Sequence, residues 1–469
     1  MKTLTKVFVF LPFCVFSQSN SFRSNIDNQR SNFFAEMSVN ISDTVQQLNI
    51  GSRFFGINSL SNKGEFYSAY LLGLGFQTNI SNKLMLTGLY DYLDGNYNSS
   101  IINYQDSLSI YYPGFGVDRH RIQFNVKYLA NRFITLDFGH GKQFVGDGYQ
   151  SLLLSDLAST YPYVKFTTKF GPVKYYNLYT TFLNPNMVDY GRKKHAAIHY
   201  LDFAITKKLH FGIFESILWQ AKSEEGVHNG YELAYLNPII FYRPVEFSKK
   251  SNKGNALMGA NFKLECQTLM LYGQFVLDDL NISRRKDSDQ NYQDGFFQNK
   301  FGCQLGVKAK IKGVDFLLEY NQVQPYTYGH RTILQNYSHM NQALAHPLGA
   351  NFKELVNIFK VRNGKWTYQI KTIFAKVGLD SVDTHYGQNI FESDLEASTG
   401  GQYSYGNFNG QGVSTDILSF QPEVSFKFQG FDLFCSVYYR IKESDLLNQT
   451  SAFYSLGIRT FPFPAFQDY

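Results

Sequence analysis

A Tyr/Asn-rich stretch at residues 402–409 holds the side chains of this chain best suited to ligand chemistry. Tyr403 and Tyr405 lie next to Gly406 and the amides Asn407 and Asn409. Aromatic faces stack on the C–H surfaces of sugars, and amides hydrogen-bond hydroxyl groups, so this composition suits carbohydrate. The loops of membrane barrels have a similar composition whatever they bind. Tyr403 and Tyr405 are therefore candidate glycan contacts, with an ordinary exposed loop as the alternative.

Patterns for metal binding and catalysis are weak. His195 and His199 share a strand face, but positions four apart on a strand are separated by more than about 10 Å. Residues 287–291 resemble the start of a calcium loop, yet Tyr292 and Gln298 replace the required glycine and glutamate. No G-x-S-x-G element is present. We predict no metal, no cofactor and no catalytic residue, and hence a non-enzymatic protein, with a looser surface calcium site at 287–294 as an alternative.

The elements that position these residues form a regular rhythm of alternating strands and tight turns. Long polar connections alternate with these turns, as in an outer-membrane barrel with short periplasmic turns and long extracellular loops. Turns that join strands in pairs, with one further strand at each end, predict about eighteen strands. The turns are Ser81-Asn82, Asn131-Arg132, Gly171-Pro172, Lys207-Lys208, Cys266-Gln267, Lys312-Gly313, Asn363-Gly364 and Gln429-Gly430.

Strand alternation separates an apolar face from a polar one most cleanly at residues 121–128. Ile122 and Phe124 would face lipid, while Arg121 and Lys127 would face a watery interior. Aromatic residues make up 17% of the chain, and the mean hydropathy is only -0.27. Both values suit a barrel, because every second strand residue faces water. We predict an all-β fold: a transmembrane antiparallel β-barrel in the outer membrane of a Gram-negative bacterium.

The termini and the charge divide the chain and restrict its partners. A basic start followed by an apolar run predicts a signal peptide at 1–18, then a short periplasmic segment at 19–45 and one barrel domain at 46–469. The net charge of +6 is spread along the chain, so no nucleic-acid partner is expected. An aromatic final strand is typical of substrates of the outer-membrane assembly machinery. Outer-membrane lipid is the other expected partner.

Four long connections are predicted to shape the extracellular side. The stretches 279–300, 324–352 and 378–414 are expected to form most of the exposed surface. The fourth, Gln220–Gly254, differs because Glu232–Leu236 followed by Asn237-Pro238 predicts a short helix. We expect that connection to fold into or over the barrel mouth.

The most distinctive string runs from Gly141 to Asp156, GKQFVGDGYQSLLLSD. It resembles the G-x-G-x-x-S-L-L-x-S element of Wzi-type capsule-assembly proteins and of their RemB-like relatives in gliding bacteria. Supporting strings follow in the family's order, at 236–246, 255–259 and 272–279. The resemblance covers residues 141 to 279, and the strand rhythm extends it over most of the chain.

The resemblance implies an eighteen-stranded barrel that takes part in surface-polysaccharide attachment or gliding motility. Its implied partners are a capsular or exopolysaccharide and proteins of the gliding machinery. Wzi-type proteins carry a helical periplasmic segment, whereas here only a short segment is expected between the signal peptide and the first strand. Any block of the lumen would therefore come from folded-in loops, 146–161 or 220–254. The alternative is a passive porin for small solutes. The matching positions, and hence further glycan candidates, are Lys142, Asp147, Tyr149 and Ser151, alongside Gly146 and Gly148.

Overall fold

The computed structural model describes residues 38–43, 46–96, 120–184, 193–222, 226, 228–231, 235, 254–281, 293–401, 403–446 and 448–460. The first strands are β1 (Ser38–Asp43), β2 (Gln46–Ser61), β3 (Phe66–Ser81), β4 (Leu84–Asn96), β5 (His120–Leu129), β6 (Ile134–Gly141), β7 (Tyr161–Phe170), β8 (Val173–Leu183), β9 (Lys193–Ala204) and β10 (Leu209–Gln220). The others are β11 (Asn255–Cys266), β12 (Leu269–Asp279), β13 (Lys300–Ile311), β14 (Val314–Val323), β15 (Ser338–His339), β16 (Gln342–Ala343), β17 (Phe352–Asn363), β18 (Trp366–Leu379), β19 (Val413–Lys427), β20 (Asp432–Ser444) and β21 (Asn448–Arg459). Two 3-10 turns, η1 (Ile333–Gln335) and η2 (Asp394–Glu396), complete the described elements.

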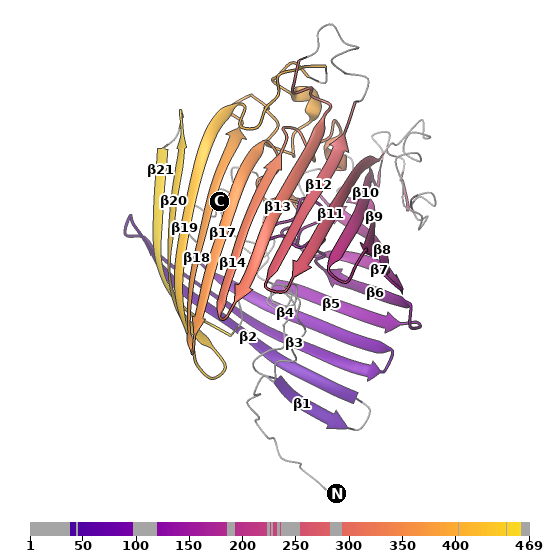
Figure 1. Ribbon diagram of the computed structural model, residues 1–469, viewed down its shortest axis with the longest axis vertical. Helices are drawn as coiled ribbons and strands as arrows, with labels where there is room; N and C mark the ends of the chain where they lie inside the picture. Colours follow the sequence, from indigo (N-terminus) through magenta and orange to yellow (C-terminus); the bar gives the residue numbers. More distant parts are fainter. Residues whose placement is uncertain are drawn as a thin grey trace, which may run out of the picture.

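The large antiparallel sheet closes on itself. Each strand from β2 to β14 and from β17 to β21 pairs with the next, and β21 pairs with β2 through the register Phe55↔Arg459 to Ser61↔Phe453 (Figure 1). Of the sheet's 19 strands, eighteen form the barrel, and β1 adds to the free part of β2 beside the end of β21. The predicted eighteen-stranded barrel is therefore confirmed, and all eight predicted turns join consecutive strands.

The outer wall carries the apolar band that a membrane requires. Exposed side chains alternate with inward-facing ones along the strands, as at Leu72 and Leu74 on β3 and Ile122 and Phe124 on β5. A closed barrel satisfies every strand hydrogen bond internally, so such a wall can face hydrocarbon. Within the described residues, no helix is long and apolar enough to cross a membrane. The chain is an outer-membrane β-barrel.

The main apolar core lies inside the barrel, against one wall. Residues 142–160 (luminal loop A) follow β6, and residues 324–351 (luminal loop B) follow β14. Leu152, Leu153 and Leu154 of loop A pack with loop B and with inward-facing side chains of β7 to β12, β14 and β17 to β19. Loop A therefore enters the lumen, as expected for a folded-in loop at 146–161. The prediction that 324–352 forms extracellular surface is wrong, because the apolar side chains of loop B, such as Leu344, are buried against loop A.

The described residues of the connection between β10 and β11 contact the opposite face of the wall. Tyr235 is fully buried against the outward-facing residues Trp219, Ile217 and Ala256. The indole nitrogen of Trp219 donates a hydrogen bond to the carbonyl of Gly230, at 3.1 Å. These described residues pack on the outside of the barrel and not into its mouth, because alternation turns Trp219 away from the lumen. Of the predicted helix at 232–236, only Tyr235 is among the described residues.

Candidate functional sites in the lumen and at the extracellular rim

Luminal loop A is anchored to the barrel wall by a buried carboxylate. Glu319 of β14 accepts hydrogen bonds from the backbone N–H groups of Tyr149 (2.6 Å) and Gln150 (3.1 Å). The hydroxyl of Tyr272 donates a third, at 2.7 Å, and the Asn321 amide donates a fourth. A carboxylate removed from water needs such donors, and here they hold the tip of the loop.

The side chain of Gln274 on β12 forms a second anchor for loop A. The side-chain carbonyl of Gln274 accepts from the backbone N–H of Leu152 at 2.7 Å, and its amide nitrogen donates to the carbonyl of Val145 at 3.1 Å. Gly146 is required here, because its φ is 118° and a Cβ would collide with the Gln274 amide. The glycines of the distinctive string thus serve the contact between loop and wall.

The four candidates within the string all contribute to this fold. Ser151 is fully buried and donates to the carbonyl of Val145 at 2.6 Å. Lys142 donates to the carbonyls of residues 156 and 157, and the carbonyl of Asp147 accepts a bond from Lys308. Tyr149 lies partly exposed to the lumen, where its hydroxyl accepts from Lys371 at 3.3 Å. Of the four, Tyr149 is the best placed to meet a solute.

Luminal loop B is held by buried polar contacts that the sequence did not indicate. His346 and Glu354 are both fully buried, with Nε2 and Oε2 2.8 Å apart. Lys194 of β9 donates to Asn336 and Ser338. His339 accepts from the backbone N–H of Leu183 and lies 3.2 Å from the carbonyl of Thr160. Burial of this imidazole lowers the pKa of His339 to about 3.

The rest of the lumen wall is lined by charge. Its charged positions lie on β17 to β21 and β2 to β5, where alternation with the exposed outer residues fixes which side chains face inward. Its acidic side chains are Asp91, Glu354, Glu423 and Asp432. Its basic side chains are Arg53, Arg121, Lys127, Lys360, Arg362, Lys371, Lys427, Arg440, Lys442 and Arg459. Positive charge therefore predominates along this wall. Val356, Ile373 and Ile417 also face inward and belong to the apolar core, so β17 to β19 contribute to both parts of the lumen.

Several of these cations are paired, and others are not. Arg459 makes a bidentate contact with Glu423, and Arg53 lies 3.5 Å from Asp91. Neither Arg440 nor Lys442, inward-facing neighbours on β20, forms an ion pair with another described residue. The Arg53, Arg459 and Lys442 side chains are partly exposed, so water reaches this wall inside the barrel.

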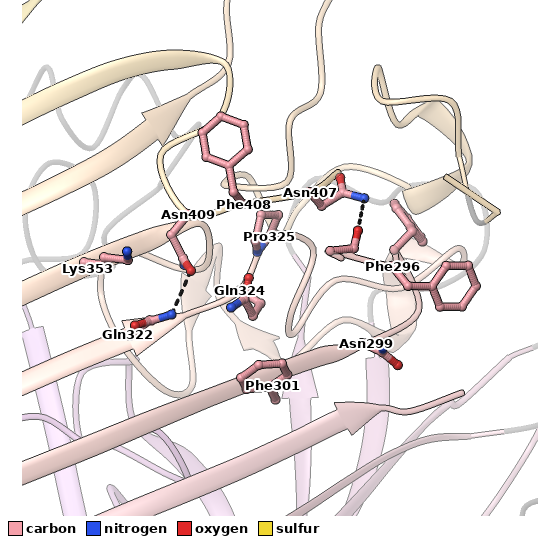
Figure 2. A pocket seen from close by; sticks show the side chains of 12 residues that line it. Phe296, Asn299, Phe301, Gln322, Gln324, Pro325, Lys353, Asn407, Phe408 and Asn409 are labelled. Carbon is pink, nitrogen blue, oxygen red and sulfur yellow. Dashed lines mark hydrogen bonds between the residues drawn. The ribbon is translucent and has the colours of Figure 1, made fainter. Parts of the chain in front are cut away.

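A pocket of about 380 Å³ lies on the outer face of the barrel at its extracellular end. Phe301, Gln322 and Lys353 project outward from β13, β14 and β17, and the connections 293–299 and 407–409 cover them (Figure 2). Backbone bonds join the two connections, as from the N–H of Asn407 to the carbonyl of Gly295, at 3.0 Å. Phenyl rings and amides line the pocket together.

The two remaining candidates lie beside this pocket. Tyr405 packs on Phe296, with ring centroids 5.0 Å apart, whereas the Tyr403 side chain is 64% exposed. Phe408 at the edge of the pocket is 62% exposed. The structure thus divides the six candidate residues between two places, four in the lumen and two at the rim. The calcium-like residues 287–291 lie outside the described residues.

Comparisons with known proteins find distant structural similarity alone. No family model and no curated protein matches it. Among solved structures, Pseudomonas aeruginosa OprD aligns with 10% identity over 87% of this chain and 94% of that chain, at a TM-score of 0.47. Pseudomonas aeruginosa OpdK with vanillate aligns with 10% identity over 88% and 97%, at a TM-score of 0.49. With TM-scores below 0.5, these similarities assign no substrate or mechanism to the chain.

Proposed function

We propose that this protein is a passive outer-membrane channel that favours small anionic solutes. The observation that carries the proposal is the lumen's asymmetry: luminal loops A and B fill the part lined by apolar side chains, and predominantly basic, water-accessible side chains line the rest. A lumen lined by one sign of charge raises the local concentration of the opposite ion and selects for it. The loops narrow the path and so restrict the size of the solute.

Tyr149 is the residue of loop A that faces this path. Its hydroxyl and ring contact Lys371 of the basic wall, so loop and wall meet at this point. A solute that passes here would meet a cation and an aromatic hydroxyl together. Carboxylates and phosphates accept hydrogen bonds from both groups.

Planar-bilayer recording tests the proposal. The wild-type protein should give steady conductance. In a salt gradient, its reversal potential should shift toward the equilibrium potential of the anion. The double variant Arg440→Gln/Lys442→Gln should reduce that anion preference several-fold, because it removes two lumen cations. Lys376→Gln is the matched control, since Lys376 faces outward on β18 and pairs with Asp416. No conductance, or a cation preference in the wild type, would contradict the proposal.

A second candidate function is surface-polysaccharide attachment, as in the Wzi-type and RemB-like proteins that residues 141–279 resemble. The extracellular rim favours it, because Tyr403 and Phe408 are exposed beside a pocket lined with amides. Lys353 and Lys376 lie opposite each other on the outer wall, so an acidic glycan would be attracted there.

The ratio of cell-bound to released polysaccharide in a deletion strain tests this candidate. Attachment predicts a shift of polymer into the medium at constant synthesis. Tyr403→Ala should reproduce part of the shift without changing conductance, because the side chain is solvent-exposed. An unchanged ratio in the deletion strain excludes attachment and leaves the channel proposal untouched.

A further inference from the structure

Three metal-ligating side chains converge in the connection between β18 and β19, which lies at the upper end of the barrel in Figure 1. They belong to Asp380, His385 and Glu392, and one donor atom of each lies within 4.8 Å of the other two. The imidazole Nδ1 of His385 is 3.4 Å from Glu392 Oε2 and 3.7 Å from Asp380 Oδ2. Donor atoms bound to one small cation are about 3 Å apart, since each lies roughly 2 Å from the ion. The triad is already near that spacing.

The imidazole in this group is buried. The His385 side chain is only 3% exposed, and neither ring nitrogen has a hydrogen-bond partner among the described residues. A buried polar atom in this state is costly and calls for an explanation, such as a bound ion. Its Nδ1 faces two carboxylate oxygens, an arrangement that a shared cation between the three groups stabilises.

Other contacts hold the donor groups in place. The backbone N–H of Tyr386 donates to Asp380 Oδ1, and the Asn389 side-chain amide donates to Glu392 Oε1 at 2.8 Å. The backbone N–H of His385 donates to the hydroxyl of Ser398, and its carbonyl accepts from the hydroxyl of Tyr326. Hydrogen bonds to the other atoms of the ligating side chains, and to their backbone, orient the ligands of protein metal sites.

We propose that Asp380, His385 and Glu392 bind one divalent transition-metal ion of the Zn²⁺ class. One imidazole nitrogen and two carboxylate oxygens are ligands that Zn²⁺ accepts, and water would complete a tetrahedron. The Glu392 side chain is 39% exposed, which leaves an entry path for the ion. The imidazole ligand argues against Ca²⁺ and Mg²⁺, which prefer oxygen alone.

The position of the site gives the ion a structural role. Tyr326 of luminal loop B donates its N–H to the carbonyl of Gly387, and the Gln388 amide donates to the carbonyl of Leu348. Residues 380–396 therefore lie against loop B. A metal ion within this segment would fix it over the loop, and metal-binding free energy would stabilise the folded connection. This inference does not depend on the channel proposal.

Zinc binding by the full-length protein in detergent tests the site directly. Protein purified without a polyhistidine tag is equilibrated with Zn²⁺, freed of excess ion and analysed for metal content. We expect about one tightly bound Zn²⁺ per chain, at least a tenfold weaker affinity in Glu392→Gln and in His385→Gln, and no comparable binding of Ca²⁺ or Mg²⁺. Wild-type protein that retains no zinc would overturn the proposal.

Matched variants separate this site from other zinc-binding positions. Asp383→Asn is the control, because Asp383 is exposed in the same connection and its φ of 59° suits asparagine equally well. It should retain the wild-type zinc content. If His385→Gln fails to fold, the partly exposed Glu392→Gln still decides the question. Zinc content and affinity that are unchanged in Glu392→Gln would assign the ion to a different site and refute this one.

Discussion

The two sides of the lumen are built from strands with the same alternation, yet they are filled differently. From β7 to β14 the inward-facing positions include Leu178, Phe214 and Leu257, which pack against luminal loops A and B. From β20 around to β5 they include the partly exposed basic side chains Lys442, Arg459 and Arg53, while β17 to β19 carry both apolar and basic inward-facing positions. An apolar inner face needs a cover, whereas a charged one needs water or counter-ions. The comparison indicates that the wall composition decides where the loops lie.

The largest effect on stability is expected from removing Glu319, which anchors luminal loop A to the barrel wall. Glu319→Ala removes the acceptor for two backbone N–H groups and a tyrosine hydroxyl, so it should destabilise loop A by on the order of 3 kcal/mol or more. Hydrogen–deuterium exchange at residues 146–156 should accelerate strongly, and single-channel conductance should rise.

The control for this variant is Glu265→Gln, which removes a partly exposed pair with Lys263 at the other end of the wall. Exposed pairs are worth at most about 1 kcal/mol, so exchange in loop A should stay as in the wild type. If Glu319→Ala leaves both exchange and conductance unchanged, the carboxylate is not what holds the loop in the lumen.

A smaller effect is expected from acid. The pKa of His339 is about 3 in the folded protein, below the usual value near 6.5, so the neutral form is favoured by folding. The stabilisation of the folded state by neutral His339 is fully present above pH 6.5 and is lost as the pH falls toward 3. At pH 5 the loss is about 2 kcal/mol for a fully coupled group.

Luminal loop B should therefore loosen between pH 6.5 and 4, and exchange near residues 337–345 should report it. His339→Gln should weaken this acid dependence, since glutamine does not titrate. His330 of the same loop, whose pKa burial lowers to about 4, should account for part of what remains. An exchange rate independent of pH, after correction for the intrinsic rate, would exclude this role for the histidines.

The smallest expected effect is a difference in stability cost between a substitution in loop A and one in the water-exposed part of the lumen. Ser151→Ala removes a buried donor to the Val145 carbonyl and should cost loop A about 1–2 kcal/mol. Gln421→Ala, at an inward-facing and partly exposed position on β19, should cost less than about 1 kcal/mol. Denaturant unfolding with loop-specific exchange measures both. Equal costs would mean that the covered wall is not more tightly packed than the open one.

Much of the barrel could be predicted because its signals are local. A turn such as Asn363-Gly364 and the alternation at 121–128 each involve adjacent residues, and together they predict the strand number and the lipid-facing side chains. The position of luminal loop B could not be predicted this way. Its polar composition is typical of exposed loops, and only contact with loop A, far away in the sequence, buries it.

The candidate residues show the same limit. The distinctive string correctly indicated a special loop, but its wall anchors Gln274 and Glu319 lie 122 and 170 residues from their partners Leu152 and Tyr149. No spacing rule connects residues at that separation. The Asp380, His385 and Glu392 triad was missed as well, because irregular backbone brings its members together and no motif describes it.

The sequence by itself determined the barrel, its strand number and its lipid-facing side chains, because period-two alternation and turn chemistry act between neighbouring residues. Only the tertiary structure decided which loops enter the lumen, which wall stays open to water and which side chains meet at the rim. Those outcomes depend on burial and hydrogen bonding between residues far apart in the chain. Closure of the barrel brings these distant residues into contact, and the local sequence does not predict such contacts.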